Sequence, residues 1–169
     1  MTAPRRGVTL LELVIASMLA TTLVTATAVL LRGMHSAWDG AEGDIQRIEA
    51  AHATVRHIVR ALRQTTDVTA ITLSTDAAGS ISALDASGNT LVWARNAGTN
   101  DVNYGIGSAD QLLAQGIAEL RFTGYKADGT TTTTVPAEIQ AVRCEVRIDL
   151  PRELSTSRKV VGWAWLRSY

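Results

Sequence analysis

The stretch PRRGVTLLELVIASMLATTLVTATAVLL, residues 4–31, decides the fold of this chain. Its last 24 positions, residues 8–31, contain a single charged side chain, Glu12. The hydrocarbon core of a bilayer is about 30 Å thick, and a helix of about 20 apolar residues crosses it. Residues 8–31 are therefore predicted to form a membrane-spanning helix.

Two arginines, Arg5 and Arg6, precede this stretch, whereas Asp39, Glu42 and Asp44 follow it. Basic residues are retained on the cytoplasmic side of a membrane. The N-terminus is therefore predicted to be cytoplasmic, and the remainder of the chain to lie on the opposite, periplasmic or extracytoplasmic side.

A secretory signal peptide is the alternative interpretation of a basic start and an apolar run. Its apolar core usually has about 7–15 residues and ends at a small-residue cleavage site. The run here is longer, but Ala26, Thr27 and Ala28 resemble such a site. A signal-anchored or secreted binding domain therefore remains open.

Glu12 is the most informative residue of the apolar stretch. A carboxylate at the bilayer centre costs about 2.5–3.5 kcal/mol on insertion scales. We therefore expect Glu12 to lie near a membrane interface or to pair with a cation.

The residues around Glu12, RRGVTLLELVIA, resemble the N-terminal signal of type IV pilin precursors. That signal has a short basic leader ending in glycine, a hydrophobic residue, and a glutamate five positions into the mature chain. The resemblance implies that a prepilin peptidase removes residues 1–7 by cleaving after Gly7 and then N-methylates Val8. Phenylalanine is commoner than valine at that position, so Val8 is a departure from the family pattern.

The same resemblance implies a role for Glu12 in assembly. Cleavage creates an ammonium at Val8, four residues and about 6 Å of helix from the carboxylate. Opposite charges in apolar surroundings must pair or be neutralised. We expect Glu12 to pair with the Val8 ammonium of a neighbouring subunit and so to set the axial register of a filament.

Helical periodicity continues beyond the apolar stretch. Apolar residues recur at spacings of three, four and seven, as in an amphipathic helix over residues 44–64; they are Ile45, Ile48, Val55, Ile58, Val59 and Leu62. One long helix over residues 8–64 is predicted, with a membrane half and a half packed on a domain. Gly33, Gly40 and Gly43 each cost a helix about 1 kcal/mol relative to alanine, so we expect a juxtamembrane break there rather than a hinge.

Residues 65–169 are predicted to form a small antiparallel β-sheet. Candidate strands cover residues 68–74, 80–84, 90–95 and 160–166, with a hairpin turn at residues 85–89. Residues 96–107 are rich in Gly and Asn and are predicted to be a loop. Residues 109–114 are a helical turn or a strand, and residues 130–134 a loop or an edge.

Two segments alternate between apolar and polar residues, as strands with one core face do. The predicted core positions are Ala118, Leu120, Phe122, Val142, Cys144, Val146, Ile148 and Leu150. Trp163 and Trp165 share a face with Val161 on the last strand, whose other face is also apolar. We expect these tryptophans to be buried in the core, with a subunit contact as the alternative.

Residues 115–169 resemble, in hydrophobic pattern and turn position, the C-terminal half of J-type minor pseudopilins of type II secretion and W-type minor pilins. The resemblance implies an α+β fold in which a long N-terminal helix packs on an antiparallel sheet. Some pseudopilins carry calcium in a C-terminal loop. Asn100, Asp101 and Asn103 offer oxygen ligands, but such loops are usually turns, and we assign no metal.

The sequence contains no constellation for catalysis. His35, His52 and His57 form no His-Glu-x-x-His pair, and neither a Gly-x-Ser-x-Gly elbow nor a phosphate-binding loop is present. We therefore expect neither an enzyme nor a cofactor. The 16 basic and 16 acidic residues balance to zero net charge, which argues against a general nucleic-acid binder.

The sequence thus predicts a minor pseudopilin or minor pilin, a structural subunit of a type II secretion pseudopilus or type IV pilus. Its expected partners are the prepilin peptidase, membrane lipid, and other pilins or pseudopilins through the N-terminal helix. A competence or adhesion minor pilin that binds DNA or surfaces is the alternative. It would require a basic patch, for which the candidates are Arg143, Arg147, Arg152 and Arg158.

Overall fold

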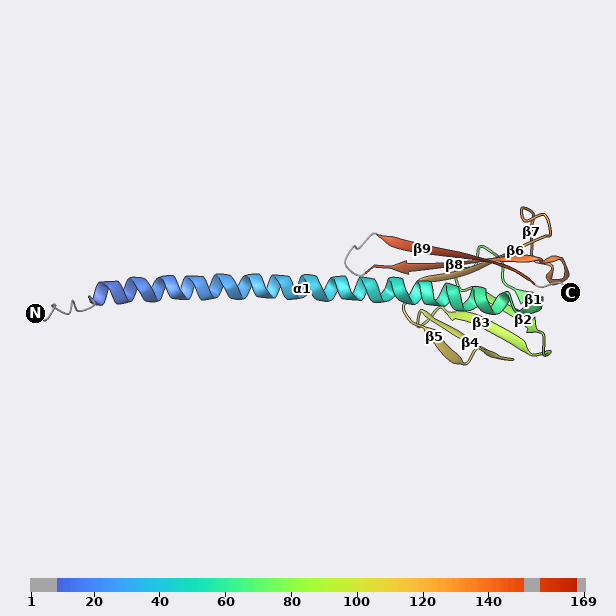
Figure 1. The fold of residues 1–169 in the computed structure, drawn as a ribbon, viewed down its shortest axis with the longest axis horizontal. Coiled ribbons are helices and arrows are strands. Elements are labelled where there is room, and N and C mark those ends of the chain that lie inside the picture. The colour runs from blue at the N-terminus through green and yellow to red at the C-terminus, as the bar shows by residue number, and fades with distance from the viewer. Residues whose placement is uncertain (1–8, 151–155, 167–169) are drawn as a thin grey trace, which may run out of the picture. The chain divides into compact units, whose positions relative to one another are not determined.

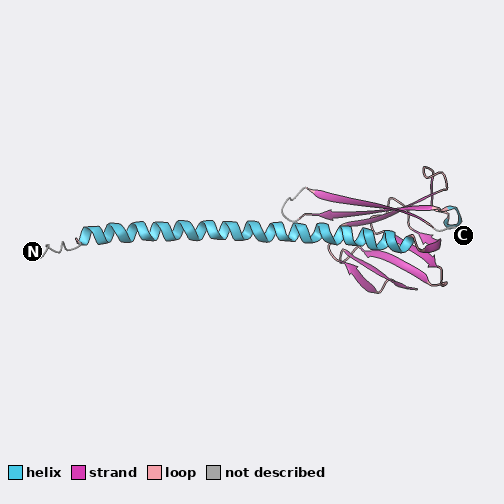
Figure 2. Ribbon diagram, viewed as in Figure 1, coloured by secondary structure: helices cyan, strands magenta, loops and turns pink. Residues whose placement is uncertain are grey.

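The computed structural model describes residues 9–150 and 156–166. Over these residues the chain forms one α-helix, nine β-strands and one 3-10 turn. All pairings between these strands are antiparallel, and one isolated parallel bridge joins Ala78 to Leu120. The fold is α+β, as predicted, with a long N-terminal helix and antiparallel sheets (Figure 2). The chain divides into two compact units between Glu42 and Gly43.

Helix α1 runs over Leu10–Leu62, which confirms the prediction of a single long helix. The predicted break is wrong, because Gly33, Gly40 and Gly43 are all helical. None of the three has a positive φ, the conformation with which a glycine commonly ends a helix. Without a proline or a left-handed residue to stop it, the helix continues through these positions.

The second unit contains the C-terminal part of α1, which is amphipathic. Ala51, Val55, Ile58 and Leu62 are at most 5% exposed and form the inner stripe of the helix. Ile45 was predicted to join this stripe, but it is 56% exposed, so the buried stripe begins later than the sequence periodicity indicates.

A five-stranded sheet follows the helix. Its spatial order is β1-β2-β3-β4-β5, which is also the order along the chain. The strands are β1 (Thr65–Ile71), β2 (Ser80–Asp85), β3 (Thr90–Asn96), β4 (Asp101–Ile106) and β5 (Gln111–Ala114). The predicted hairpin is confirmed, because β2 and β3 pair from Ser80↔Ala94 to Leu84↔Thr90 across the turn at residues 85–89.

A four-stranded sheet completes the unit in the order β7-β6-β8-β9. Its strands are β6 (Glu119–Tyr125), β7 (Thr132–Thr133), β8 (Ala141–Asp149) and β9 (Ser157–Trp165), and the 3-10 turn η1 covers Pro136–Glu138. The sequence led us to expect one small sheet. The structure has two sheets instead, because β5 and β6 do not pair with each other.

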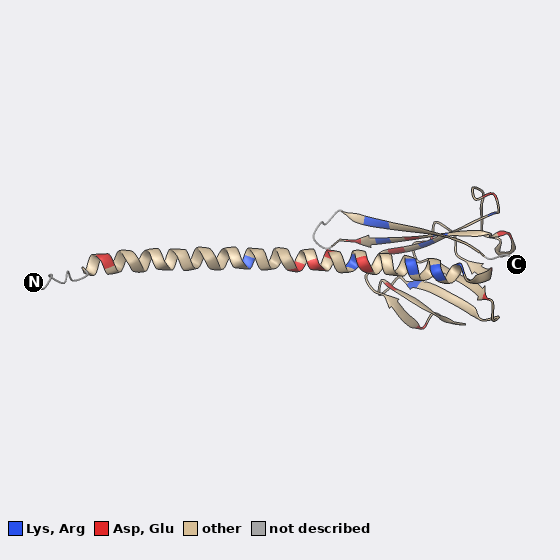
Figure 3. Cartoon of the chain, viewed as in Figure 1, with Lys and Arg blue, Asp and Glu red and all other residues tan. Residues whose placement is uncertain are grey.

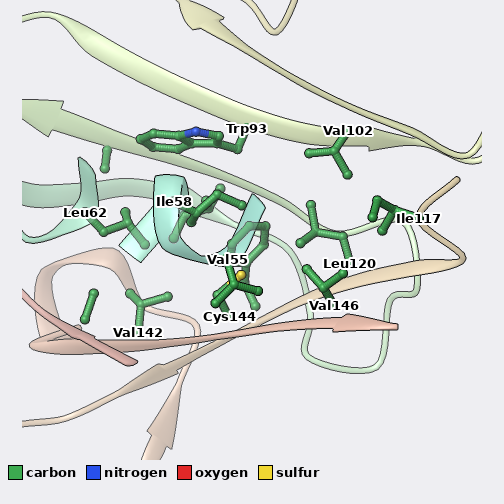
Figure 4. Packing of buried hydrophobic residues seen from close by; sticks show 14 of the residues in the cluster. Val55, Ile58, Leu62, Trp93, Val102, Ile117, Leu120, Val142, Cys144 and Val146 are labelled. Carbon is green, nitrogen blue, oxygen red and sulfur yellow. The ribbon is translucent and has the colours of Figure 1, made fainter. Parts of the chain in front are cut away.

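The core lies where the C-terminal part of α1 runs between the two sheets (Figure 1). Figure 4 shows Val55, Ile58 and Leu62 of the helix among side chains from both sheets, including Trp93 and Cys144. Cys144 is fully buried, as predicted, and burial raises the pKa of its thiol to about 12. The helix thus provides the surface on which both sheets pack.

Three predictions about the sheets need correction. Residues 96–107 are not a loop throughout, because β4 lies within them and buries Val102 between polar neighbours. The first strand is Thr65–Ile71 rather than residues 68–74, since it begins directly after the helix. Ala118 precedes β6 and is only partly buried, whereas its neighbour Ile117 is fully buried.

The predicted burial of Trp163 and Trp165 is also wrong. Strand β9 lies at the edge of its sheet, and these side chains are 40% and 55% exposed on its outer face. The inner face carries Gly162 and Ala164, and Ala164 is fully buried. Because the two tryptophans are exposed on an edge strand, the alternative prediction of a subunit contact is the one that remains open.

Candidate functional site

The N-terminal end of α1 holds Glu12 in a compact set of hydrogen bonds. The backbone N–H of Thr9 donates to Glu12 Oε2 at 3.0 Å, and the Thr9 hydroxyl donates to the same oxygen at 3.2 Å. In return, the Glu12 backbone N–H donates to Thr9 Oγ1 at 3.3 Å. This is a capping box, the Thr-x-x-Glu arrangement that satisfies free N–H groups at a helix start.

Thr9 is a site residue that the sequence analysis missed. The signal was present, since Thr9 stands three positions before Glu12 at the start of an apolar helical run. The capping box explains why α1 begins at Leu10. It also occupies the Glu12 carboxylate within its own chain.

The remaining residues of the predicted processing site, Arg5, Arg6, Gly7 and Val8, lie outside the described residues. The spacing of about 6 Å between Val8 and Glu12 assumed a helical backbone between them. Because the described helix begins at Leu10, this spacing stays a prediction.

The first part of α1 exposes large apolar side chains along its whole length. Leu10, Leu19 and Leu30 are 83%, 65% and 67% exposed. This helix is long and apolar enough to cross a membrane. Between Glu12 and Arg32 it carries no charge (Figure 3).

The hydroxyl groups of this apolar segment bond within the helix. Thr21 donates to the carbonyl of Ser17 at 2.7 Å, and Thr25 donates to that of Thr21 at 2.7 Å. Ser17 and Thr27 make equivalent bonds to preceding carbonyls. Polar groups satisfied in this way are compatible with apolar surroundings, where an unpaired hydroxyl is costly.

The outer face of the four-stranded sheet carries arginines that were candidates for a basic patch. Arg143 pairs with Glu145 at 2.8 Å, and Arg147 pairs with Glu119 at 2.9 Å. Lys159 pairs with Glu145 as well. Arg152 lies outside the described residues and Arg158 is exposed on β9. Glu119 and Glu145 are thus each shared by two cations, so this face carries ion-paired charges rather than an uninterrupted basic patch.

Among the described residues, no group of three His, Cys, Asp or Glu side chains comes together to hold a metal ion. His57 packs edge-on against Tyr104, with ring centroids 4.9 Å apart, and near Trp93 at 6.5 Å. Burial lowers the pKa of His57. His57 is therefore a packing residue of the sheet unit.

The Asn-rich loop before β4 is held by an arginine. Asn100 Oδ1 accepts a hydrogen bond from an Arg95 guanidinium nitrogen, and Arg95 Nε donates to the carbonyl of Ile117 at 2.7 Å. Asn100 has a φ of 59°, as in a tight turn. A guanidinium already occupies the oxygen that a calcium ion would need, so the geometry favours a turn.

Comparison with known proteins identifies no relative: no protein-family model, curated protein or solved structure matches this chain.

Proposed function

We propose that this chain is a minor pseudopilin or minor pilin, a structural subunit that a type II secretion or type IV pilus system assembles from the membrane into a helical filament or its tip. The observation that carries the proposal is the apolar first part of α1, with exposed side chains and one carboxylate, Glu12, beside its start. A surface this apolar requires lipid or other helices as its surroundings. A subunit that leaves a membrane and enters a helical bundle is surrounded first by lipid and then by other helices.

The proposal also uses the residues before the helix. Arg5 and Arg6 hold the N-terminus in the cytoplasm, and the sheet unit is extracytoplasmic. The prepilin peptidase cleaves after Gly7 and methylates the new terminus at Val8. The leader is thereby removed together with its two positive charges.

Glu12 acts by changing its partner during assembly. Before assembly, its carboxylate accepts hydrogen bonds from Thr9 in the capping box. In the filament it pairs with the Val8 ammonium of a neighbouring subunit, because an ion pair in low dielectric is much stronger than in water. This pairing sets the axial position at which an entering subunit stops in the filament.

Replacing Glu12 tests this function. Glu12→Leu removes the carboxylate and increases apolar character, so membrane insertion should be retained while incorporation into filaments falls at least about tenfold, as expected when a pair worth 1.4 kcal/mol or more is lost. The measurement is the fraction of the chain recovered in sheared filaments relative to the membrane fraction.

Two variants serve as controls. Glu12→Gln retains a hydrogen-bond acceptor for the capping box but not the charge, so it should fail to assemble as Glu12→Leu does. Asp39→Asn removes a carboxylate outside the apolar segment and should assemble normally. Normal incorporation of Glu12→Leu would contradict the proposed function.

A further inference from the structure

Strand β9 has an unpaired edge. It pairs with β8 in unbroken register from Ala141↔Trp165 to Asp149↔Ser157, and no described strand pairs with its other side. The Leu166 N–H donates to the Gln140 carbonyl at 3.0 Å, which continues the ladder with β8. Since hydrogen-bonding direction alternates along an antiparallel strand, the backbones of Val161, Trp163 and Trp165 point outward.

This edge lacks the usual protection against strand pairing. Proteins block exposed edges with prolines, bulges or charged side chains. Over its described length β9 has neither a proline nor a bulge, and from residue 160 to residue 165 it has no charged side chain. Arg63 donates to the outward Trp163 carbonyl at 3.1 Å and occupies that acceptor, so an added strand would pair with the backbone of Val161 and Trp165 on either side of it.

A groove runs between this edge and the exposed face of α1. Its strand side is formed by Val161 and Trp163. The helix side combines Val55, Val59 and Gln64 with basic residues that share one face at spacings of four, four and three; the basic residues are His52, Arg56, Arg60 and Arg63.

The arginines of this groove differ from those of the outer sheet face. Arg121, Arg143 and Arg147 each pair with a glutamate. In contrast, neither Arg56 nor Arg60 lies within ion-pair distance of a carboxylate among residues 9–150 and 156–166. The groove therefore presents positive charge that is not neutralised by the described part of the chain.

We propose that this groove binds an extended acidic segment of a partner protein, which adds as a strand to the edge of β9. Backbone hydrogen bonds to Val161 and Trp165 supply affinity, as in other strand additions. Alternate side chains of the added strand face α1, where Arg56 and Arg60 select carboxylates. A peptide can use both the backbone hydrogen bonds of the strand edge and the positive charge of the groove. The phosphates of a nucleic acid would use only the positive charge. This site goes beyond the filament function and does not depend on processing at Val8.

The proposal is tested with the full chain in detergent micelles and three labelled probes. These are a short peptide of alternating Glu and Thr, the same peptide with Lys in place of Glu, and a single-stranded oligothymidine. The Glu peptide should bind, and the Lys peptide should not. On binding, amide hydrogen exchange should slow at Val161 and Trp165, which surface adsorption would not cause.

Two variants separate the charge from the strand edge. Arg56→Glu with Arg60→Glu should weaken binding of the Glu peptide at least about tenfold, whereas the matched Arg56→Lys with Arg60→Lys keeps the charge and should retain binding. Val161→Pro removes one outward N–H without changing charge and should also weaken binding. Circular dichroism checks that each variant is folded.

Several results would overturn the proposal. One is the absence of Glu-peptide binding to the folded wild-type chain. Another is binding that leaves amide exchange at Val161 and Trp165 unchanged. Tighter binding of the oligothymidine than of the Glu peptide would assign the groove to nucleic acid instead. A filament defect in Glu12→Leu has no bearing on these outcomes, so the two proposals fail independently.

Discussion

At the scale of single residues, His57 links the packing of the sheet unit to pH. Its ring lies between Tyr104 and Trp93, and Nδ1 is buried without a hydrogen-bond partner among the described residues. Protonation would place a charge at this site, which desolvation disfavours. The pKa of His57 is accordingly lowered from its ordinary 6.5.

The lowered pKa predicts acid destabilisation. Because the folded pKa lies below the unfolded value, the unfolded chain binds more protons between the two, and stability falls as pH decreases from about 6.5. Above that pH the neutral ring is present in both states and the contribution is complete. Urea unfolding of wild type and His57→Gln at pH 5 and pH 7.5 measures the effect. An equal pH dependence in the two proteins would disprove it.

Gly162 predicts a second residue-level effect. A Cβ added there would lie 2.5 Å from Val55 Cγ1 and 2.7 Å from Val59 Cγ2. Gly162→Ala should therefore destabilise the fold by about 1–3 kcal/mol through overpacking. Gly33→Ala is the comparison without a clash: no atom lies within 4 Å of its added Cβ, so this helical substitution should instead stabilise by up to about 1 kcal/mol. Adding Val55→Ala should recover part of the Gly162→Ala loss, and unfolding midpoints measure all three.

The residue scale also shows where sequence reasoning reached its limit. Glu12 stands out in the sequence because one charge in an apolar stretch is costly. Gly162 does not stand out, since its importance comes from two helix side chains that are distant in the sequence. Contacts of that kind appear only once the strand is placed against the helix.

At the scale of elements, the hydrophobic pattern predicted which residues of a strand are buried better than it predicted the position of the strand in its sheet. The alternation in β6 and β8 gave the buried positions Leu120, Phe122 and Val146 correctly. In β9 both faces are apolar, and the pattern does not distinguish an edge strand from a central one. In β4 the Gly and Asn content masked a strand that is held by pairing with β3.

Two tryptophans test the assignment of centre and edge. Trp93 on β3 is 1% exposed, whereas Trp165 on β9 is 55% exposed. Trp93→Ala should lower the free energy of unfolding by about 3–5 kcal/mol because it leaves a cavity. Trp165→Ala should lower it by less than about 1 kcal/mol, as surface substitutions do. Equal losses in urea unfolding would contradict the edge position of β9.

At the scale of the whole molecule, the balanced charge conceals an uneven distribution. From Leu10 to Leu31 the helix carries only Glu12 as a charged residue, while most ionisable side chains belong to the second unit. The exposed apolar side chains of the first unit are of the kind that lipid or other helices cover, and the proposed filament would supply such helices.

Mass spectrometry of the mature N-terminus tests the proposal that this chain is processed as a pilin-like precursor. The chain is isolated from membranes of cells that contain a prepilin peptidase, with a strain lacking the peptidase as the control. We expect the chain from peptidase-containing cells to begin at Val8 and to carry one added methyl group. The chain from the control strain should retain residues 1–7. A mature start near Thr27, or an intact Met1 in both strains, would contradict it.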